Sequence, residues 1–355
     1  MKKFSIVLFL FFALTTIYTQ TNRSITKWNL QTFYTIPKLS IRALYVVSDN
    51  EVWFAANHGC WGYTKDGGVT WKIDSIQVDG LFPEFRGIAV LNDSTVLLMG
   101  IASPGFIFKT TNKGKTWKIV FRNNQKEIFF DSMIFKDKKN GMVIADPIHQ
   151  EVLILKTKDG GDTWQLDSNE VAPIFDTNTA FFASSNTNIE WKKNHIWLVT
   201  GGGNSDVWLN ENKAYTFDRY ETGFPEGETM TGIYSMDFWD SKLGVIAGGN
   251  YDKADTSITI LAMTKDSGKH WEEIKIDQPM FGSCVQFLNK NELFVTGKPG
   301  TFHYDLKKKK ILYIIDSENK NIGFHTLRIS PSKKVVWLAG GDGKIGKIDL
   351  NKNVK

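Results

Sequence analysis

The chain has 355 residues, of which 13% are aromatic and 23% charged, and this balance excludes an intrinsically disordered protein and allows one large closed all-β domain. Its net charge of +5 comes from 43 Lys and Arg against 38 Asp and Glu, and Arg supplies only six of the cations. Because Arg is the residue that recognises phosphate in bidentate geometry, we expect no nucleic-acid partner.

The N-terminus has the pattern of a secretory signal peptide. Lys2 and Lys3 precede an apolar stretch from Phe4 to Tyr18, which is shorter than the roughly 20 residues of a membrane-spanning helix. We therefore predict a signal peptide over residues 1–20 and a mature chain over 21–355. The mature protein is expected to be exported to the periplasm or the cell exterior, to lack a membrane span and to be monomeric.

A repeated eight-residue motif follows along the chain. Four copies match well: Thr64–Trp71 (TKDGGVTW), Thr110–Trp117 (TTNKGKTW), Thr157–Trp164 (TKDGGDTW) and Thr264–Trp271 (TKDSGKHW). Degenerate copies stand at Asn210, Asp305 and Asp349. The seven copies are roughly 40 to 55 residues apart, a length that suits four short strands and indicates a β-propeller.

The motif has a physical explanation as a folding device. The acidic or amide side chain accepts hydrogen bonds from backbone N–H groups of the turn, the Gly supplies a positive φ, and the Trp covers the hairpin. We assign this structural role to Asp66, Trp71, Asn112, Trp117, Asp159, Trp164, Asp266 and Trp271.

The predicted fold is all-β, a seven-bladed β-propeller with four-stranded antiparallel blades over residues 21–355. The expected blades are 36–80, 81–125, 126–170, 171–222, 223–277, 278–316 and 317–355. No Trp-containing strand follows the last motif, whereas Thr26–Leu30 is similar to such a strand. We therefore expect residues 24–33 to complete the last blade and close the ring.

A second repeated position falls in the first strand of each blade, which lines the central channel of a propeller. It supplies the candidate binding residues at one mouth of the channel: Arg42, Arg86, Asp131, Thr179, Tyr234 and His325. Thr179–Phe181 is the loosest copy and stands for the fourth blade. Two interpretations remain open, a docking site for a partner and a set of polar residues that satisfy one another around a water-filled channel.

No residue pattern calls for a metal or a cofactor. The six His show no i,i+4 pair, and Gly201–Gly203 is not followed by a helix pattern that would hold a pyrophosphate. A carboxylate in a tight turn, such as Asp146, is an alternative candidate for binding a cation. Cys60 and Cys284 fall at different points of their repeats, so we expect two separate buried thiols.

The motif resembles the Asp-box (BNR) repeat of sialidase-like and sortilin-like propellers. A sialidase-like glycoside hydrolase acting on an acidic glycan is the enzymatic alternative, but Phe85–Ile88 (FRGI) only loosely resembles the FRIP signature and follows the first box. The segments FASSNT (182–187) and GIYSMDF (232–238) resemble the photosystem II stability/assembly factor-like propellers. That resemblance implies a non-catalytic scaffold, without cofactor, that binds a partner protein or envelope component during assembly through a basic patch.

Overall fold

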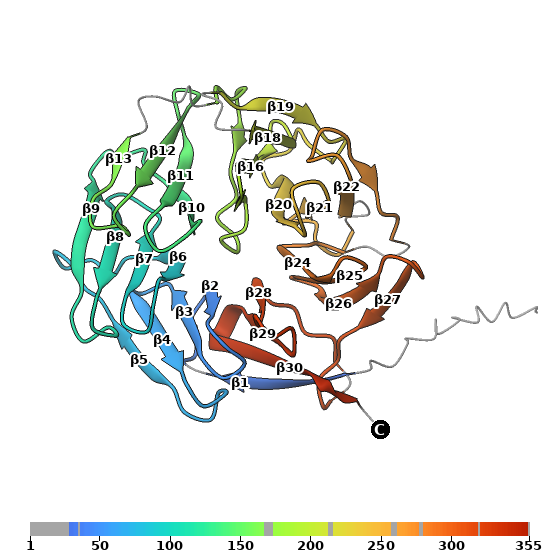
Figure 1. Cartoon of the computed structure of the whole chain (residues 1–355), viewed down its shortest axis with the longest axis horizontal. Helices are drawn as coiled ribbons and strands as arrows, with labels where there is room; N and C mark the ends of the chain where they lie inside the picture. The colour runs from blue at the N-terminus through green and yellow to red at the C-terminus, as the bar shows by residue number, and fades with distance from the viewer. Residues whose placement is uncertain are drawn as a thin grey trace, which may run out of the picture.

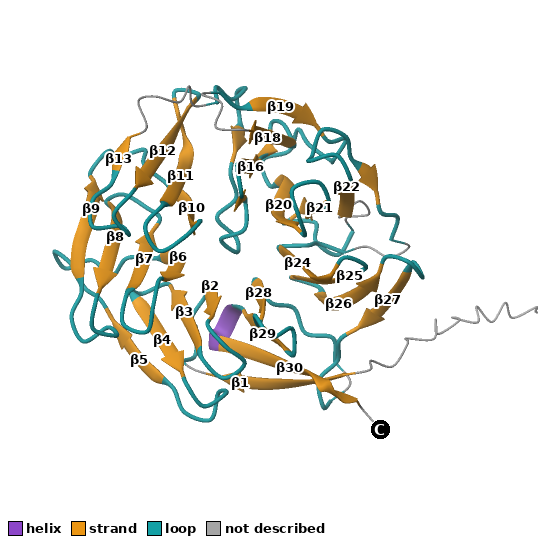
Figure 2. Ribbon diagram, in the orientation of Figure 1, coloured by secondary structure: helices purple, strands orange, loops and turns teal. Residues whose placement is uncertain are grey.

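The computed structural model describes residues 28–34, 36–166, 173–211, 216–256, 261–276, 280–318 and 320–353. The predicted signal peptide lies outside these residues. Within them, seven antiparallel sheets stand radially around one axis (Figure 1). Strands and loops make up nearly the whole drawing, with a single 3-10 turn over Gly341–Gly343 (Figure 2). The predicted all-β, seven-bladed propeller is confirmed.

Every blade has four strands that follow one another from the channel outward. The first three blades are β2 (Ile41–Val46), β3 (Val52–Ala56), β4 (Cys60–Thr64), β5 (Lys72–Ser75); β6 (Phe85–Val90), β7 (Val96–Gly100), β8 (Gly105–Thr110), β9 (Lys118–Asn123); and β10 (Phe130–Phe135), β11 (Gly141–Ile148), β12 (Glu151–Thr157), β13 (Gln165–Leu166). The fourth and fifth are β15 (Ile189–Lys192), β16 (His195–Val199), β18 (Asp206–Glu211), β19 (Asp218–Glu221); and β20 (Thr231–Phe238), β21 (Gly244–Asn250), β22 (Leu261–Thr264), β23 (Glu272–Glu273). The last two are β24 (Cys284–Asn289), β25 (Glu292–Gly297), β26 (Gly300–Asp305), β27 (Lys310–Tyr313); and β28 (Thr326–Ile329), β29 (Val335–Ala339), β30 (Lys344–Asn353), β1 (Trp28–Tyr34).

The first and last described strands, β1 and β30, meet in the seventh blade. Strand β1 pairs antiparallel with β30, with Leu30 opposite Ile348 and Tyr34 opposite Lys344. Figure 1 shows this pair as a blue strand beside a red one. The side chains of Trp28 and Leu30 are buried, and the Trp28 indole N–H donates to the Leu350 carbonyl at 3.2 Å. This is the arrangement that closes the ring and covers the edge of the last sheet.

Each Asp-box forms a hydrogen-bonded turn between the third and fourth strands. In the first box the Thr64 hydroxyl donates to the Asp66 carboxylate at 2.8 Å and accepts the Gly68 N–H at 3.0 Å. The other Asp66 contacts are the N–H and hydroxyl of Thr70, at 2.9 and 2.6 Å. These donors hold the pKa of Asp66 at about 2, below its ordinary value.

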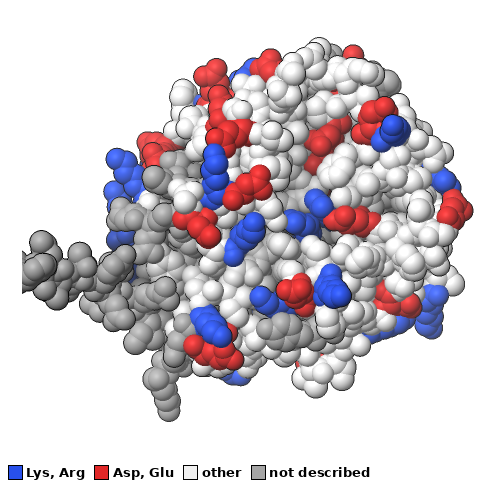
Figure 3. Space-filling model, turned by 180° about the vertical axis from the view of Figure 1, so that it is seen from behind, with Lys and Arg blue, Asp and Glu red and all other residues white. Residues whose placement is uncertain are grey.

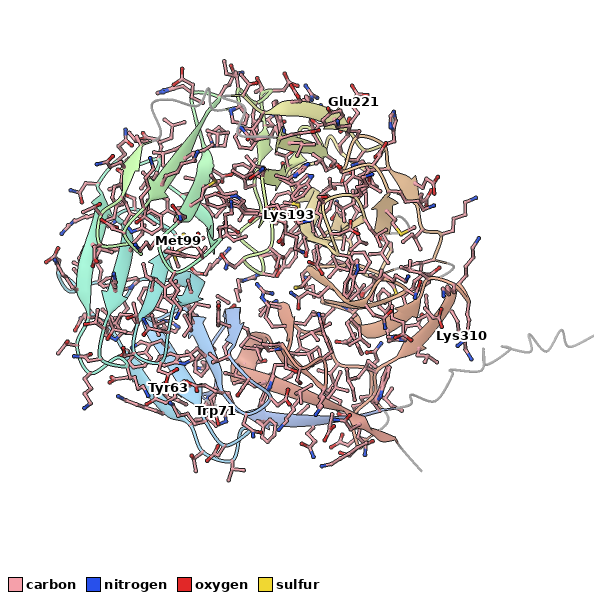
Figure 4. All side chains as sticks on the ribbon, in the orientation of Figure 1. Tyr63, Trp71, Met99, Lys193, Glu221 and Lys310 are labelled. Carbon is pink, nitrogen blue, oxygen red and sulfur yellow. The ribbon has the colours of Figure 1, made fainter. Side chains whose placement is uncertain are left out.

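The Trp side chains of the first two boxes pack against an aromatic ring of an adjacent blade. Trp71 lies edge-on to Trp337 of the seventh blade, with ring centroids 6.2 Å apart, and Trp117 lies edge-on to Trp61 of the first blade at 5.1 Å. Trp71 is labelled on the outer part of the first blade in Figure 4. The aromatic surface of the motif therefore seals one blade against the next.

The fourth blade begins later than the sequence predicted. Thr179 and Ala180 form the short strand β14, which pairs with β17 (Gly201–Gly202) and so extends the sheet of the fifth blade. The inner strand of the fourth blade is β15 instead. The prediction that Thr179–Phe181 forms the fourth inner strand was therefore wrong, because β14 pairs with β17 and the residues between β14 and β15 enter the central channel.

Both cysteines are free and buried, as predicted. They lie in β4 and β24, and burial raises the pKa of the Cys60 thiol to about 11. Among the described residues, no helix has the length and apolar character that crossing a membrane requires.

Candidate functional site

A segment of the chain fills the central channel. Residues 183–188, which we call the channel plug, hydrogen-bond to inner strands of six blades. The partners are Arg42, Arg86, Ser132, Met133, Ser235, Ser283, Thr326 and Arg328. A segment that reaches inner strands all around the ring must lie on the ring axis.

The plug satisfies the polar groups of the inner strands. The Asn186 side chain accepts the Met133 N–H at 2.8 Å and donates to the Met133 carbonyl at 3.1 Å. The guanidinium of Arg328 donates to the carbonyls of Ser185 and Asn186 at 2.9 and 3.2 Å. Arg328 is therefore engaged inside the channel, and its positive charge does not join a basic patch at the mouth where the inner strands start.

The channel end where the inner strands finish holds a partnered ion network. Lys192 lies 3.5 Å from Glu190 and 3.4 Å from Asp237, and the second Asp237 oxygen accepts the Phe287 N–H at 2.7 Å. Burial raises the pKa of Glu190 to about 7. These charges satisfy one another and show no group that calls for an external ligand.

The mouth where the inner strands start contains a cavity of about 340 Å³. Its polar lining is Arg42, Arg86, Asp146, Ser184 and Thr229, and its aromatic lining is Phe129, Phe181, Phe182, Tyr234 and Tyr251. The plug forms part of the wall through Ala183 and Ser184. A hollow with an apolar wall and a few convergent polar groups is the usual form of a ligand site.

The cavity brings together three of the six residues proposed from the sequence. Arg42, Arg86 and Tyr234 line it. Asp131 is fully buried beside it, and Thr179 belongs to β14 and does not line it. His325 is not a lining residue either, and burial together with the nearby cations Arg42 and Arg86 lowers the pKa of its ring to about 3.

The two arginines differ in how their charge is balanced. Arg86 donates through Nε to Glu84 at 2.8 Å, lies 2.7 Å from the same oxygen through Nη2, and donates to the Ala183 carbonyl at 3.0 Å. The hydrogen-bond partners of Arg42 are neutral, the Ser184 hydroxyl at 3.5 Å and the phenol of Tyr251, and its buried Nε has no hydrogen-bond partner among the described residues. Burial and the positive charge of Arg86 lower the pKa of Arg42. Arg42 is thus a partly buried cation that forms no ion pair with a carboxylate in the described part of the chain.

The aromatic wall is rigid and apolar. The rings of Phe182 and Tyr234 are stacked, with centroids 4.1 Å apart, and the Tyr234 hydroxyl donates to the Met230 carbonyl at 2.9 Å. Lys298 lies over the Tyr251 ring, 4.4 Å from its centroid. Burial raises the pKa of Tyr234. A tyrosine nucleophile needs the opposite, a base that removes its proton, so Tyr234 is not activated in the manner of a glycosidase nucleophile.

Sequence reasoning missed Phe182, Tyr251 and the role of Asp146 as a lining residue. Asp146 and Tyr251 follow the main pairing of the second strands of their blades, and only the closed ring brings those turns next to the inner strands. Phe182 belongs to the segment that leads into the plug. A signal was present in the spacing between the third and fourth boxes, because the interval from Asp159 to Asn210 is longer than the two intervals before it and contains Phe182 and the plug. An insertion in a repeat array often forms a binding element.

Two other features add no second candidate site in the described part of the chain. In the described residues, no group of three or more His, Cys, Asp or Glu side chains is placed to hold a metal ion. Figure 3 shows the rear face of the molecule, where basic and acidic side chains alternate without a broad region of one sign.

The similarity of this chain to known proteins is found in its three-dimensional structure. No protein-family model matches the sequence, and no curated protein matches it either. The structure resembles YCF48 bound to a D1 peptide, with a TM-score of 0.69 and 14% identity over 91% of this chain and 98% of that chain. The fold is that of YCF48. YCF48 from Cyanidioschyzon merolae gives a TM-score of 0.67 and 13% identity, covering 91% of this chain and 100% of that chain.

The similarity to YCF48 confirms, at the level of fold, the propeller group that the Asp-box motifs predicted. An enzyme shares the architecture more distantly. The GH74 enzyme of Niastella koreensis has a TM-score of 0.54 and 14% identity, covering 77% of this chain and 46% of that chain. Identities this low establish the shared fold alone, so function must be argued from the cavity itself.

Proposed function

We propose that this protein is an exported, non-catalytic scaffold that binds a partner protein or envelope component at the Arg42 cavity. The observation that carries the proposal is the partly buried Arg42 guanidinium, which has a buried Nε without a hydrogen-bond partner, forms no ion pair with a carboxylate among the described residues and borders an aromatic wall. A buried cation is stable when an anion neutralises it, because desolvation otherwise opposes its charge. The ligand we infer is a carboxylate adjoining an apolar or aromatic side chain.

The dimensions of the cavity suit part of a polypeptide. A volume of about 340 Å³ accepts one or two side chains, so a partner would insert a short segment and rest the remainder on the blade surfaces. YCF48 bound to a D1 peptide is an example of a propeller of this shape that binds a peptide. For the present chain we propose the same general mode of binding and a role in holding a partner during assembly.

Binding should be tested with a displayed library of random peptides. We expect wild-type protein to enrich peptides in which Asp, Glu or the chain terminus adjoins an aromatic or aliphatic residue. Arg42→Ala removes the cation and should abolish that enrichment. Arg122→Ala is the matched control, since Arg122 is exposed on the outer strand β9 and pairs with Asp79 at 2.7 Å. Equal enrichment by wild type and Arg42→Ala would contradict the proposal.

Hydrolysis of an acidic glycan is the competing function. It requires an activated nucleophile, and the Tyr234 hydroxyl instead donates to a main-chain carbonyl within a stacked aromatic pair. We therefore expect no sugar release from a panel of sialosides and acidic polysaccharides. Turnover that disappears in Tyr234→Phe would overturn the non-catalytic assignment.

Export is the second part of the proposal and depends on residues 1–20. A charged start followed by a short apolar stretch directs secretion in bacteria. Cell fractionation with N-terminal sequencing should find mature protein, lacking these residues, outside the cytoplasm. Full-length protein retained in the cytoplasm would exclude export.

A further inference from the structure

Two carboxyl groups lie together behind the wall of the Arg42 cavity. Asp131 occupies the irregularity in the pairing of β10 with β11, between Phe130 opposite Ala145 and Ser132 opposite Ile144, and Asp146 directly follows Ala145. Asp131 has no exposed surface, and neither of its oxygens accepts a hydrogen bond from any donor among the described residues. Asp146 lines the cavity. The two carboxyls are near enough to interact directly.

Hydrogen-bond donors for this pair are few. One Asp146 oxygen accepts the Phe181 N–H at 2.8 Å. Arg86 is the nearest cation to Asp131, but its N–H groups point to Glu84 and to the Ala183 carbonyl. Two adjacent carboxylates removed from water repel each other, and each also loses hydration. A proton between them relieves both effects by turning one oxygen into a donor.

The other charged and titratable groups around the cavity keep their state in mildly acid solution. Arg42 and Arg86 stay protonated because guanidinium groups do not lose their proton in proteins. His325 has a pKa of about 3 and remains neutral. Burial raises the pKa of Tyr234, so it stays neutral as well. Glu84 is already paired with Arg86.

The directions of the pKa shifts agree with this geometry. Burial raises the pKa of Asp131 well above its ordinary value, and the neighbouring charge of Asp146 adds to the increase. Burial raises the pKa of Asp146 to about 6. The pair therefore holds its protons at a higher pH than two ordinary carboxyls do, and Asp146 takes up a proton as the pH falls through about 6.

We propose that Asp131 and Asp146 form a proton-sharing pair that couples proton uptake to anion binding in the Arg42 cavity. The inference rests on the proposed function, because it concerns the ligand of that cavity. At neutral pH the negative charge of Asp146 offsets part of the positive potential that Arg42 and Arg86 create in the cavity. An incoming carboxylate is then attracted less strongly. Uptake of a proton removes this negative charge, so anion affinity rises as the pH falls. By reciprocity, anion binding draws a proton onto the pair.

The expected gain in affinity follows from removing one charge from the cavity wall. At side-chain separations and the effective dielectric of a partly buried site, one charge changes affinity by about tenfold. We therefore expect the affinity for an anion to increase about sixfold between pH 7.5 and pH 5.5, because with a pKa of about 6 the pair is not fully protonated at the lower pH. The same binding event should take up a fraction of a proton that is largest between about pH 6 and pH 7, because binding raises the pKa of the pair above its value in the free protein.

The test uses full mature protein and benzoate, a carboxylate on an aromatic ring that stays ionised across this range. Calorimetry at pH 7.5, 6.5 and 5.5, in two buffers of different ionisation enthalpy, measures affinity and proton uptake in the unmodified protein. Asp146→Asn should bind benzoate with the higher affinity at every pH and without proton uptake. Asp93→Asn, at an exposed position in the second blade, should behave as wild type.

A second measurement separates this inference from the proposed function. Carbon NMR of protein labelled at the aspartate carboxyls reports the proton on the pair without any ligand. Ordinary titration of both carboxyls overturns the inference even where benzoate binds, and so does benzoate affinity that is independent of pH. A retained proton at pH 7 with no benzoate binding at any pH would instead count against the cavity as an anion site, and so against the proposed function.

Discussion

Closure of the ring by β1 gives a quantitative prediction for Trp28. The side chain is 3% exposed, and its ring lies 5.6 Å from that of Phe294 and 5.0 Å from that of His303, both in the sixth blade. It therefore joins the last blade to its neighbour as well as to β30. Trp28→Ala removes a buried indole and leaves a cavity, which costs about 3–5 kcal/mol. An unfolding entropy of about 2.1 cal/mol/K per residue converts this cost to a decrease in Tm of about 4–7 °C for a chain of this length.

Thermal unfolding followed by circular dichroism measures the effect. Gln31→Ala is the matched control because Gln31 lies in the same strand with an exposed side chain, and its Tm should change by less than about 1 °C. Equal Tm values for wild type and Trp28→Ala would show that β1 does not hold the ring together, although it pairs with β30.

Three further predictions concern the boxes, a turn and the buried carboxyls. Thr64→Val leaves the Gly68 N–H without its acceptor in a buried turn and should destabilise the protein by about 1–3 kcal/mol in a urea titration. Gly114→Ala places a methyl group 2.1 Å from the Trp61 ring and should greatly lower the Tm, whereas Gly80→Ala, at a similar positive φ with no atom within 4 Å, should cost only about 1 kcal/mol. The folded-state pKa of Asp146 is raised from its ordinary value of 3.8 to about 6, so its contribution to stability is present at low pH and is lost as the pH rises through this range. The stability of wild type relative to Asp146→Asn should therefore fall between these two pH values and level off above them. A stability difference that does not change with pH would contradict the raised pKa.

The features that sequence predicted best are those that neighbouring residues determine. The Asp66 turn is built from Thr64, Gly68 and Thr70, all within a few residues, so a short motif contains its whole hydrogen-bond pattern. Repetition then indicated the number of blades. Closure followed from the same logic, because a missing strand at one end and a spare one at the other must pair in a ring.

The plug was not predictable because its partners are distant in sequence. Arg328 donates to Ser185 across more than a hundred residues, and no local pattern signals that contact. The error at Thr179 has the same origin. Its spacing and apolar neighbours suit an inner strand, but pairing with β17 leaves the following residues free to enter the channel. A strand pattern reports local propensity, and tertiary contacts decide which sheet the strand joins.

The plug also explains why a ring of seven similar blades has an asymmetric cavity at its mouth. Equivalent inner strands around an open channel would offer several nearly identical positions, none able to surround a small group. The insertion before β15 breaks this repetition by placing Ala183 and Ser184 at the end of the cavity and Phe182 against Tyr234. The Ala183 carbonyl of this insertion accepts a hydrogen bond from Arg86, whereas Arg42 makes a longer contact with the Ser184 hydroxyl. The same insertion thus occupies the channel, shapes the aromatic wall and leaves Arg42 without an ion pair to a carboxylate among the described residues.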